Sequence, residues 1–188
     1  STISEIPRPE KLNNVEAGIR VKQANFQYNA NFYYMGYKDQ LVLTGQLNDV
    51  GAYIRENVAS SYRAGIELDA AVMLSPKWTL GGNVAFSRNK IDSYTESSDV
   101  YDENWDFTGQ ESITYTNTDI AFSPDVVASA IIDFKPVNNL ELSLLNKYVG
   151  RQFLDNAQQV DRSLDDYWTT DFRFVYTWKP GYVKEMVF

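Results

Sequence analysis

The sequence predicts an all-β protein, an antiparallel up-and-down transmembrane β-barrel of which this chain supplies about seven to eight strands. Three observations support this fold class. Apolar and polar residues alternate with a period of two over several long segments, while helical periodicity is weak. Short and long connections alternate strictly between these segments. Aromatic residues also stand at both ends of the clearest strand, at Trp168 and Trp178.

The alternation defines the expected strands in order along the chain. The first two cover residues 15–22 and 26–34, and the next two cover residues 61–74 and 78–89. Further strands are expected at residues 126–134, 140–144, 168–178 and 182–188. The short turns that join them are expected at residues 23–25, 75–77, 135–139 and 179–181, and three of the four contain Pro beside Lys, which is ordinary turn chemistry.

The remaining connections, at residues 39–58, 90–121 and 150–165, are expected to be long loops on the opposite side of the sheet. Tight turns on one side and long loops on the other are typical of outer-membrane barrels. Strand length agrees: Trp168 and Trp178, ten residues apart, are separated by ~33 Å along the strand, or ~25 Å of height at a tilt of ~40°. That is the height of the apolar band of such barrels.

The period-two pattern does not tell which face looks inward. A soluble ligand-binding β-barrel or a surface adhesin, the alternative, puts the apolar face inside, whereas a membrane barrel turns it toward lipid. Strand length, loop asymmetry and the aromatic strand ends favour the membrane barrel. The residues then expected to face lipid include Tyr28, Phe32, Leu68, Val84, Ile132, Phe172 and Phe174.

Composition excludes several classes of protein. The 188 residues include no Cys and no His, which removes thiolate and histidine metal sites and Ser-His-Asp catalysis. The net charge of −8 argues against nucleic-acid binding, and no apolar run approaches the ~20 residues of a membrane helix. Adjacent carboxylates such as Asp165 and Asp166 point to opposite sides of a strand, a poor geometry for acid–base catalysis. We therefore expect no enzyme and no cofactor.

The two ends of the chain do not fit a complete barrel. The first expected strand starts on the side of the long loops and ends at a short turn. The last expected strand starts at a short turn and runs toward the side of the long loops. A complete bacterial barrel has an even number of strands and both termini on the short-turn side. Residues 1–188 are therefore expected to be part of a single, larger barrel domain.

Six sequence segments together resemble a known family. They are "PRPEKLNNVEAGIR" (7–20), "NFYYMGYKDQLV" (31–42), "SYRAGIELD" (61–69), "LSPKWTL" (74–80), "FSPDVVAS" (122–129) and "KYVGRQFLDN" (147–156). In this order and spacing, the chain resembles the C-terminal barrel of TonB-dependent outer-membrane receptors, particularly those of Bacteroidetes. The resemblance covers essentially the whole chain.

The resemblance implies a 22-stranded barrel whose lumen is filled by an N-terminal plug, with this chain at about strands 14–21 and both the plug and the closing strand outside it. It implies uptake of a scarce ligand of the siderophore, glycan, peptide or cobalamin class, energised through TonB, at the cell outer membrane. The implied partners are outer-membrane lipid and lipopolysaccharide, the receptor's own plug and the TonB complex through regions outside this chain. A surface lipoprotein is a further candidate partner, and no nucleic acid is expected.

One connection carries most of the negative charge. Residues 90–119 hold one cation, Lys90, and eight carboxylates, a net charge of −7. Aromatic residues stand among these acids, which suits a sugar, peptide or cationic ligand better than an anionic ferric siderophore. The residues expected to bind ligand are Tyr101, Asp102, Trp105, Asp106 and Phe107. The alternative is an acidic loop that only packs on its neighbours.

Within this connection, Asp102, Asn104 and Asp106 have the D-x-N-x-D spacing of a calcium loop. Phe107 and Ile113 occupy the positions where an EF-hand needs Gly and Glu, so the segment is not an EF-hand. A looser calcium site at these three residues is the candidate that remains.

Charged residues of the polar strand face form the second candidate set, Arg63, Glu67, Asp69, Asp171 and Arg173. They are expected to face the lumen and to bond to the plug or to adjacent strands, with direct ligand contact as the alternative. Arg151 and Asp155, in the third long connection, are expected to form local ion pairs.

Overall fold

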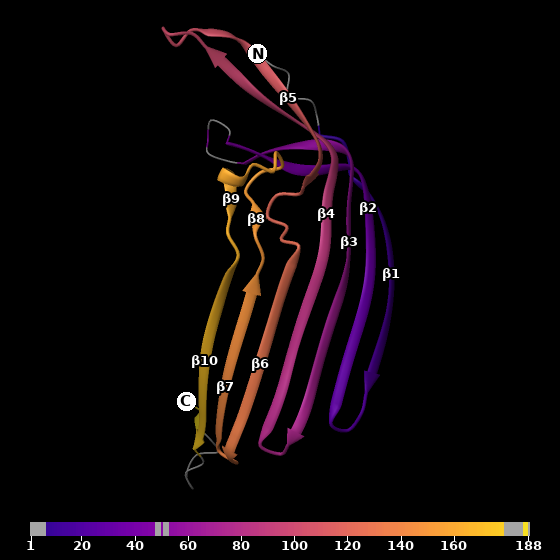
Figure 1. Cartoon of the computed structure of the whole chain (residues 1–188), viewed down its shortest axis with the longest axis vertical. Helices are drawn as coiled ribbons and strands as arrows, with labels where there is room; N and C mark the ends of the chain where they lie inside the picture. Colours follow the sequence, from indigo (N-terminus) through magenta and orange to yellow (C-terminus); the bar gives the residue numbers. More distant parts are fainter. Residues whose placement is uncertain (1–6, 48–49, 51–52, 179–185, 188) are drawn as a thin grey trace.

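The computed structural model describes residues 7–47, 50, 53–178 and 186–187. Its main sheet is antiparallel and curved, with the strand order β1-β2-β3-β4-β6-β7-β10-β11 (Figure 1). These strands are β1 (Lys11–Lys22), β2 (Phe26–Leu47), β3 (Tyr53–Ser75), β4 (Trp78–Tyr101), β6 (Val126–Val137), β7 (Leu140–Val149), β10 (Tyr167–Trp178) and β11 (Met186–Val187). Among the residues that the structure describes, no helix has the length and hydropathy needed to cross a membrane.

The strand β5 (Phe107–Asp119) lies off the main sheet. Its partner β4 pairs with β6 over residues 78–86 and with β5 over residues 90–101. One long strand therefore belongs to the sheet with its first half and to a projecting two-stranded ribbon with its second half (Figure 1). A small second sheet, β8 (Gln152–Phe153) with β9 (Ser163–Leu164), and the 3-10 helix η1 (Val160–Arg162) lie between β7 and β10.

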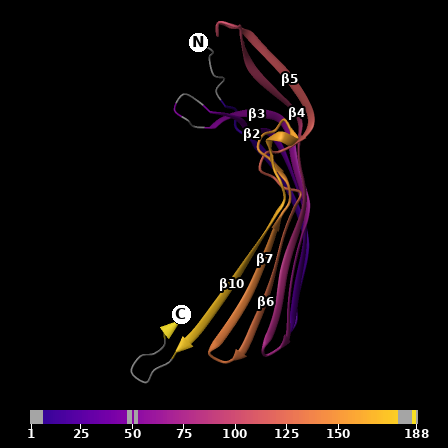
Figure 2. The same ribbon diagram turned by 60° about the vertical axis from the view of Figure 1, so that its left-hand side comes forward.

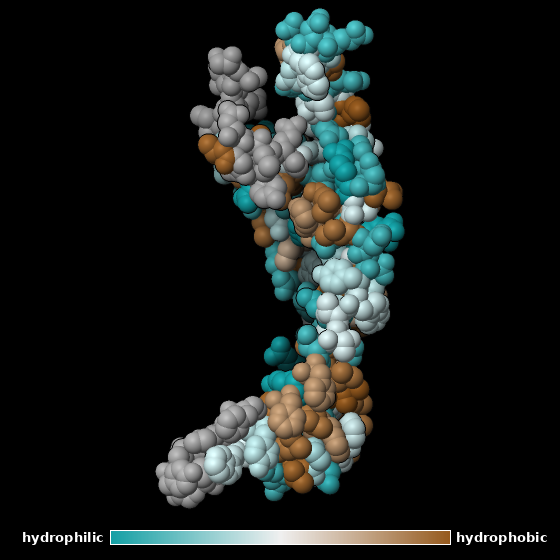
Figure 3. Space-filling model, turned by 90° about the vertical axis from the view of Figure 1, so that its left-hand side faces the viewer, coloured by the Kyte–Doolittle hydropathy of each residue, from teal (hydrophilic) through white to brown (hydrophobic). Residues whose placement is uncertain are grey.

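The sheet has one apolar and one polar face, as the alternation predicts. Register places Phe32, Ile66 and Phe86 side by side on the apolar face. The seven residues expected to face lipid all share this face, and Phe172 on it is 67% exposed. Hydrophobic residues gather toward the lower end in this view, whereas the upper half mixes hydrophilic residues with smaller hydrophobic patches (Figure 3). A single sheet that exposes large aromatic side chains in this way requires an apolar surrounding.

Aromatic pairs stand at both ends of the apolar face. Near the short turns, the rings of Trp78 and Phe134 stack with centroids 4.2 Å apart. Toward the long connections, Tyr148 and Trp168 lie 4.8 Å apart, and Tyr34 stacks on Tyr62 at 6.1 Å. Such pairs are typical of the aromatic girdles that bracket the apolar band of a membrane barrel.

The short turns largely follow the prediction. The 75–77 turn is confirmed, with Ser75 Oγ accepting a hydrogen bond from the Lys77 amide at 3.2 Å. The 23–25 turn is also confirmed, while the 135–139 turn is shorter than expected because β6 continues to Val137. The 179–181 turn lies outside the described residues, and Met186 and Val187 are the described part of the last expected strand.

The prediction of a long loop is wrong for two of the three connections. Residues 39–58 and 90–121 mostly continue the strands on either side, so that β2, β3, β4 and β5 extend as ribbons beyond the sheet. The outer part of the β4–β5 ribbon, residues 98–113, is largely exposed on both faces and so has no reason to alternate apolar and polar residues, which hid it from the period-two pattern. Cross-strand hydroxyl pairs hold one face of the β4–β5 ribbon, with Thr95 and Thr114 Oγ1 atoms 3.0 Å apart. The 150–165 connection is irregular, as expected.

Residues with a left-handed backbone conformation lie where the ribbons leave the sheet. Asp39 in β2 has a φ of 55°, and Asn117 in β5 has the same value. Asp and Asn tolerate this conformation better than other residues with a side chain. The Asn57 amide donates to the Asp39 carbonyl at 2.7 Å, and the β2–β3 ribbon turns toward the concave side of the sheet (Figure 2).

Close strand contact at Gly65 gives a first testable prediction. A Cβ at Gly65 would lie 2.4 Å from the Phe86 carbonyl oxygen and 2.7 Å from the Tyr33 hydroxyl. Gly65→Ala is therefore expected to destabilise the barrel by ~1–3 kcal/mol, because backbone must move. Urea unfolding of the full-length receptor in detergent measures this. Gly36→Ala, whose Cβ meets only the Tyr34 side chain at 3.2 Å, is the matched control, and equal midpoints for the two variants would contradict the prediction.

Candidate functional site

The three long connections fold together at one end of the sheet. They form a small buried cluster, called the loop core here, made of Val42, Val58, Ile91, Tyr94, Ile120 and Ala157. These residues come from β2, β3, β4 and two connections, so the loop core joins segments that are far apart in sequence. It lies where the ribbons leave the sheet, at the mouth of the concave face.

Asn156 fixes the 150–166 connection to the loop core. Its side chain is fully buried, and its Oδ1 accepts a hydrogen bond from the Ala121 amide at 2.8 Å. Its Nδ2 donates to the Leu43 carbonyl at 2.5 Å. One buried amide thus satisfies backbone groups of two other long connections.

An ion-pair network fixes the same connection to the β4–β5 ribbon. Arg162 Nη1 lies 2.9 Å from Glu96 Oε1 and 2.8 Å from Asp155 Oδ2. The hydrogen bond to Glu96 raises the pKa of Arg162 above its ordinary value, with further support from Asp155. The Asp155 side chain is only 6% exposed, so this arginine compensates a buried carboxylate.

Tyr94 completes the loop core with a polar contact. Its hydroxyl donates to the Thr44 carbonyl at 3.0 Å. Burial raises the pKa of Tyr94, and the nearby carboxylates of Glu56, Glu96 and Asp155 raise it further. The phenol is therefore neutral and acts as a hydrogen-bond donor at physiological pH.

A polar hollow of about 480 Å³ lies below the loop core on the concave face. Arg63 lines it and donates to Asn89 Oδ1 at 3.2 Å and to Ser123 Oγ at 3.0 Å. Glu67 lines the same hollow, so the structure brings two of the five predicted polar-face residues together. Arg63 also lines a smaller hollow beside the loop core, and so stands between the two. The polar hollow and the loop core above it together form the candidate functional site.

The other three predicted polar-face residues lie elsewhere. Asp69 shares the polar face but sits between Asn29 and Asn83 in register, outside the hollow. Asp171 is opposite Leu145 on β7, and Arg173 forms an ion pair with Glu141 toward the short turns. Lys135 Nζ lies 3.1 Å from the same Glu141 carboxylate. Arg173 therefore has a partner within the wall, and its contact with a plug stays a prediction.

The residues predicted to bind ligand form the tip of the β4–β5 ribbon, which projects beyond the sheet (Figure 1), and none of them lines the polar hollow. Tyr101 and Phe107 face each other edge-on with centroids 6.1 Å apart, and Trp105 is 84% exposed. Asp102 Oδ1 accepts from the amides of Asn104 at 2.8 Å and Asp106 at 2.9 Å. That carboxylate caps the turn, which accounts for the D-x-N-x-D spacing without a metal.

A calcium site at this tip stays a prediction. Within the described ranges, no group of three His, Cys, Asp or Glu side chains is placed to hold a metal ion. Ligand binding by the aromatic tip likewise stays a prediction.

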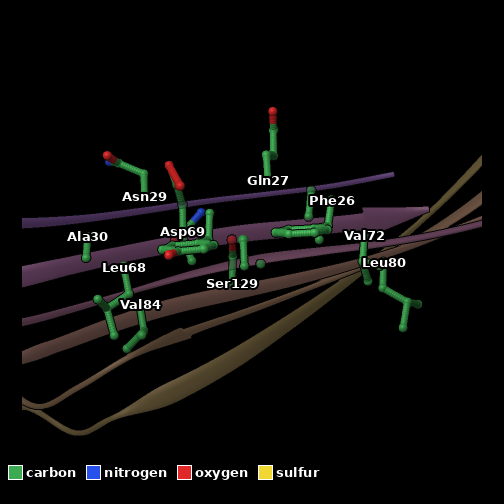
Figure 4. Close-up of a pocket in the computed structure, with 16 residues that line it drawn as sticks. Phe26, Gln27, Asn29, Ala30, Leu68, Asp69, Val72, Leu80, Val84 and Ser129 are labelled. Carbon is green, nitrogen blue, oxygen red and sulfur yellow. The ribbon is translucent and has the colours of Figure 1, made fainter. Parts of the chain in front are cut away.

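A separate, apolar hollow of about 720 Å³ lies on the other face of the sheet. The small residues Ala70 and Gly82 make its floor, and Leu68 and Val84 point away from Gln27 on the opposite side of the strands (Figure 4). It belongs to the face expected to contact lipid, so it is not a candidate for a polar ligand.

Sequence reasoning missed the polar side chains that hold the site together. Glu96 and Asn156 were not singled out, and neither was Arg162. Arg151 and Asp155 do form local ion pairs as expected, with Asp165 at 3.3 Å and with Arg162. The available signal was the segment 155–159, in which four of five residues are Asp, Asn or Gln.

Solved structures with the same fold carry titles that name an uptake receptor, a copper transporter and a siderophore receptor. The ferric yersiniabactin uptake receptor FyuA from Yersinia pestis matches with a TM-score of 0.60 and 20% identity over 89% of this chain and 22% of its own. The copper transporter OprC matches with a TM-score of 0.64 and 15% identity over 92% and 23%. The siderophore receptor PiuA from Acinetobacter baumannii matches with a TM-score of 0.61 and 16% identity over 89% and 22%.

The chain thus spans less than a quarter of the length of these three structures, and the likeness shows the fold. The comparison with curated proteins gives no match. A family model described as "TonB dependent receptor-like, beta-barrel" matches residues 6–186, nearly the whole chain. The resemblance drawn from the sequence is therefore confirmed at the level of the family, and the chain belongs to the TonB-dependent receptors, outer-membrane β-barrel proteins that are not enzymes.

Proposed function

We propose that this chain is part of the wall and external mouth of a transporter that takes up a scarce ligand, energised through TonB. The observation that carries the proposal is the two-faced sheet: an apolar face ending in aromatic pairs, and a concave face with a polar hollow beneath the loop core. A passage through a membrane needs this combination of a lipid-compatible exterior and a polar interior.

The ligand belongs to the siderophore, glycan, peptide or cobalamin class in this proposal. The titles of similar structures name siderophores and copper, which supports a metal-linked ligand. The acidic charge of residues 90–119 instead favours a neutral or cationic ligand. A glycan or peptide receptor of Bacteroidetes type, with a surface lipoprotein, is the variant that the sequence phrases and this charge favour together.

We propose further that residues 1–188 are a C-terminal part of one barrel domain and that the polar face receives the receptor's own plug. Arg63 and Glu67 in the hollow, with Asp69 and Asp171 on the same face, offer charged partners to a plug surface. The TonB complex then acts through regions outside this chain.

Spin labels test the membrane assignment. The chain contains no cysteine, so a Cys introduced in place of Phe32 or Phe172 carries the only label within it. In the full-length receptor in liposomes, these labels are expected to be accessible to lipid-soluble oxygen and shielded from a water-soluble nickel chelate. Labels at the neighbouring Asn31 and Asp171, on the polar face, are the controls. Preferential access of the nickel chelate to Phe32 and Phe172 would sink the assignment.

An uptake assay tests the transport function itself. The full-length receptor is expressed in a strain lacking it and offered iron-55 siderophores, copper-64, labelled cobalamin and fluorescent oligosaccharides or peptides. One class is expected to accumulate, and its accumulation should stop when TonB is removed or the proton gradient is dissipated. Accumulation that persists without TonB would contradict the proposal.

A further inference from the structure

The polar hollow below the loop core is built from neighbouring rows of side chains on the concave face. Register places Met35, Arg63 and Asn89 in the row nearest the long connections. The row nearest the short turns contains Asn31 and Glu67, and all five residues line the hollow. Arg63 and Glu67 are four residues apart on β3, which separates their Cα atoms by ~13 Å along the strand. The hollow therefore has a cation toward one end and a carboxylate toward the other.

An aromatic side chain forms the floor between these two charges. Gly65 lies midway between the two charged residues on β3, and its missing side chain leaves room for the Tyr33 phenol. A Cβ at Gly65 would lie 2.7 Å from the Tyr33 hydroxyl oxygen, so the phenol crosses over the glycine. Glu16, the register partner of Tyr33 on β1, adds a second carboxylate to the lining. The floor is thus suited to the uncharged middle of a ligand with charged ends.

The charged groups of the hollow have no ion-pair partners among the residues that the structure describes. Arg63 donates to two neutral acceptors, and Glu16 accepts from the neutral Asn14 amide at 2.7 Å. Other arginines of the chain differ, since Arg162 and Arg173 each lie against a carboxylate. The hollow therefore keeps one positive and two negative groups for an occupant of its own.

The lining becomes more positive toward the mouth. A smaller hollow of about 260 Å³ shares Arg63 with the polar hollow, and Arg55 lines it as well. Within the described part of the chain, no carboxylate lines this smaller hollow. The lining of the concave face thus changes from positive beside the loop core to negative at Glu16 and Glu67. A field of this kind orients a ligand that carries two opposite charges.

A residue with a strained backbone lines the same hollow. Phe122 is 48% exposed and has a φ of 55°. This left-handed conformation is rare and costly for an aromatic residue, and such outliers cluster at ligand sites. The Phe122 amide donates to the Phe153 carbonyl at 2.9 Å, which fixes the backbone in this conformation. The exposed ring offers an apolar contact beside the charged groups.

We propose that the polar hollow binds a short peptide with free termini, its carboxylate at Arg63 and its ammonium group at Glu67 and Glu16. The planar guanidinium suits a carboxylate, and carboxylates suit a protonated amine. An extended peptide spans ~3.3–3.6 Å per residue, so about four residues bridge the ~13 Å between the charges. The Tyr33 phenol and the Phe122 ring contact the residues between the termini. The inference rests on the proposed transport function and selects the peptide class for it.

The other ligand classes of the proposed function fit this lining less well. A neutral glycan would cover Arg63 and both glutamates without supplying an opposite charge to any of them, which is costly. An anionic ferric siderophore would meet the carboxylates of Glu16 and Glu67. A peptide with free termini supplies both signs of charge, and it replaces plug groups at the same side chains.

Equilibrium dialysis of the full-length receptor in detergent tests this inference. The probe is an equimolar library of tetrapeptides, prepared with free termini, with an acetylated amino terminus or with an amidated carboxyl terminus. The wild type is expected to bind each blocked library about tenfold more weakly than the free one, because each block removes a charge-assisted contact. This comparison uses the wild type alone and does not depend on how a variant folds.

Variants assign each terminus to its side chain. In Arg63→Met, amidation should no longer weaken binding, and in Glu16→Gln/Glu67→Gln, acetylation should no longer do so. Arg20→Met and Asp171→Asn make the same kinds of charge change on the polar face outside the hollow. Both controls should respond to the two blocks like the wild type.

Three results would overturn the proposal. Equal binding of the free and blocked libraries by the wild type would show that the termini are not recognised. Full sensitivity of Arg63→Met to amidation would place the carboxylate elsewhere. Absence of bound tetrapeptide at millimolar concentration would leave the charged groups to the plug alone. TonB-dependent uptake of another ligand class would then keep the transport function while the peptide inference fails, and peptide binding without TonB-dependent uptake would do the reverse.

Discussion

A full-length receptor carrying Arg162→Met is expected to lose the packing of residues 150–166 on the loop core. The substitution leaves the Asp155 carboxylate, 6% exposed, without its cation. Breaking a buried pair in this way costs ~3 kcal/mol here, the low end of the usual range, because the Arg162 side chain is 39% exposed and water reaches it. That free energy corresponds to about a hundredfold rise in the local opening constant.

Hydrogen exchange of the full-length receptor measures this opening. The Phe122 amide donates to the Phe153 carbonyl at 2.9 Å, and the Leu154 amide donates to the Arg162 carbonyl at the same distance. Peptides containing these amides should exchange about a hundredfold faster in the variant, while peptides from β6 and β7 should not change.

Two further variants make the Arg162 prediction specific. Arg151→Met removes the exposed ion pair with Asp165, whose side chain is 84% exposed, and should change exchange little because exposed pairs contribute ~0–1 kcal/mol. Adding Asp155→Asn to Arg162→Met removes the uncompensated charge and should recover most of the lost protection. If the double variant is no better protected than Arg162→Met alone, the loss comes from packing and the ion-pair account is wrong.

The sheet was predictable because a strand with lipid on one face and a polar interior on the other alternates apolar and polar residues. Successive residues of β10 lie on opposite faces of the sheet, so Phe172 on the apolar face is followed directly by Arg173 on the polar face. The same logic failed at residues 90–121, because the outer part of this ribbon, residues 98–113, is largely exposed on both faces. There Ser97 and Ser112 pair across two strands, and no sequence period distinguishes such strands from a loop.

The candidate site was less predictable because its contacts are long-range. The period-two pattern placed Arg63 and Glu67 on the polar face, and the structure brings both into one hollow. Arg162 and Glu96 are 66 residues apart, and Asn156 and Leu43 are 113 apart. No local spacing encodes such partners, since they meet only when two connections bend over the same end of the sheet.

Asn156→Leu is expected to have the second large effect, because it removes a side chain that bonds to two other connections. Leucine has the same branching at Cγ but neither accepts from the Ala121 amide nor donates to the Leu43 carbonyl. Each buried backbone group left without a partner costs ~1–3 kcal/mol, which gives ~2–5 kcal/mol for the pair. Unlike Arg162→Met, this variant should raise exchange in the β2–β3 ribbon as well as in residues 150–166.

The two halves of the Asn156 amide can be separated. Asn156→Asp keeps an acceptor for the Ala121 amide but places a carboxylate against the Leu43 carbonyl, so exchange should rise mainly in the β2–β3 ribbon. Asn104→Leu, at the exposed ribbon tip, makes the same change where no side-chain hydrogen bond is lost, and should be neutral. If Asn156→Leu loosens residues 150–166 but leaves the β2–β3 ribbon protected, the bond to Leu43 does not hold that ribbon, and the loop core must do so through Val42 and Val58 alone.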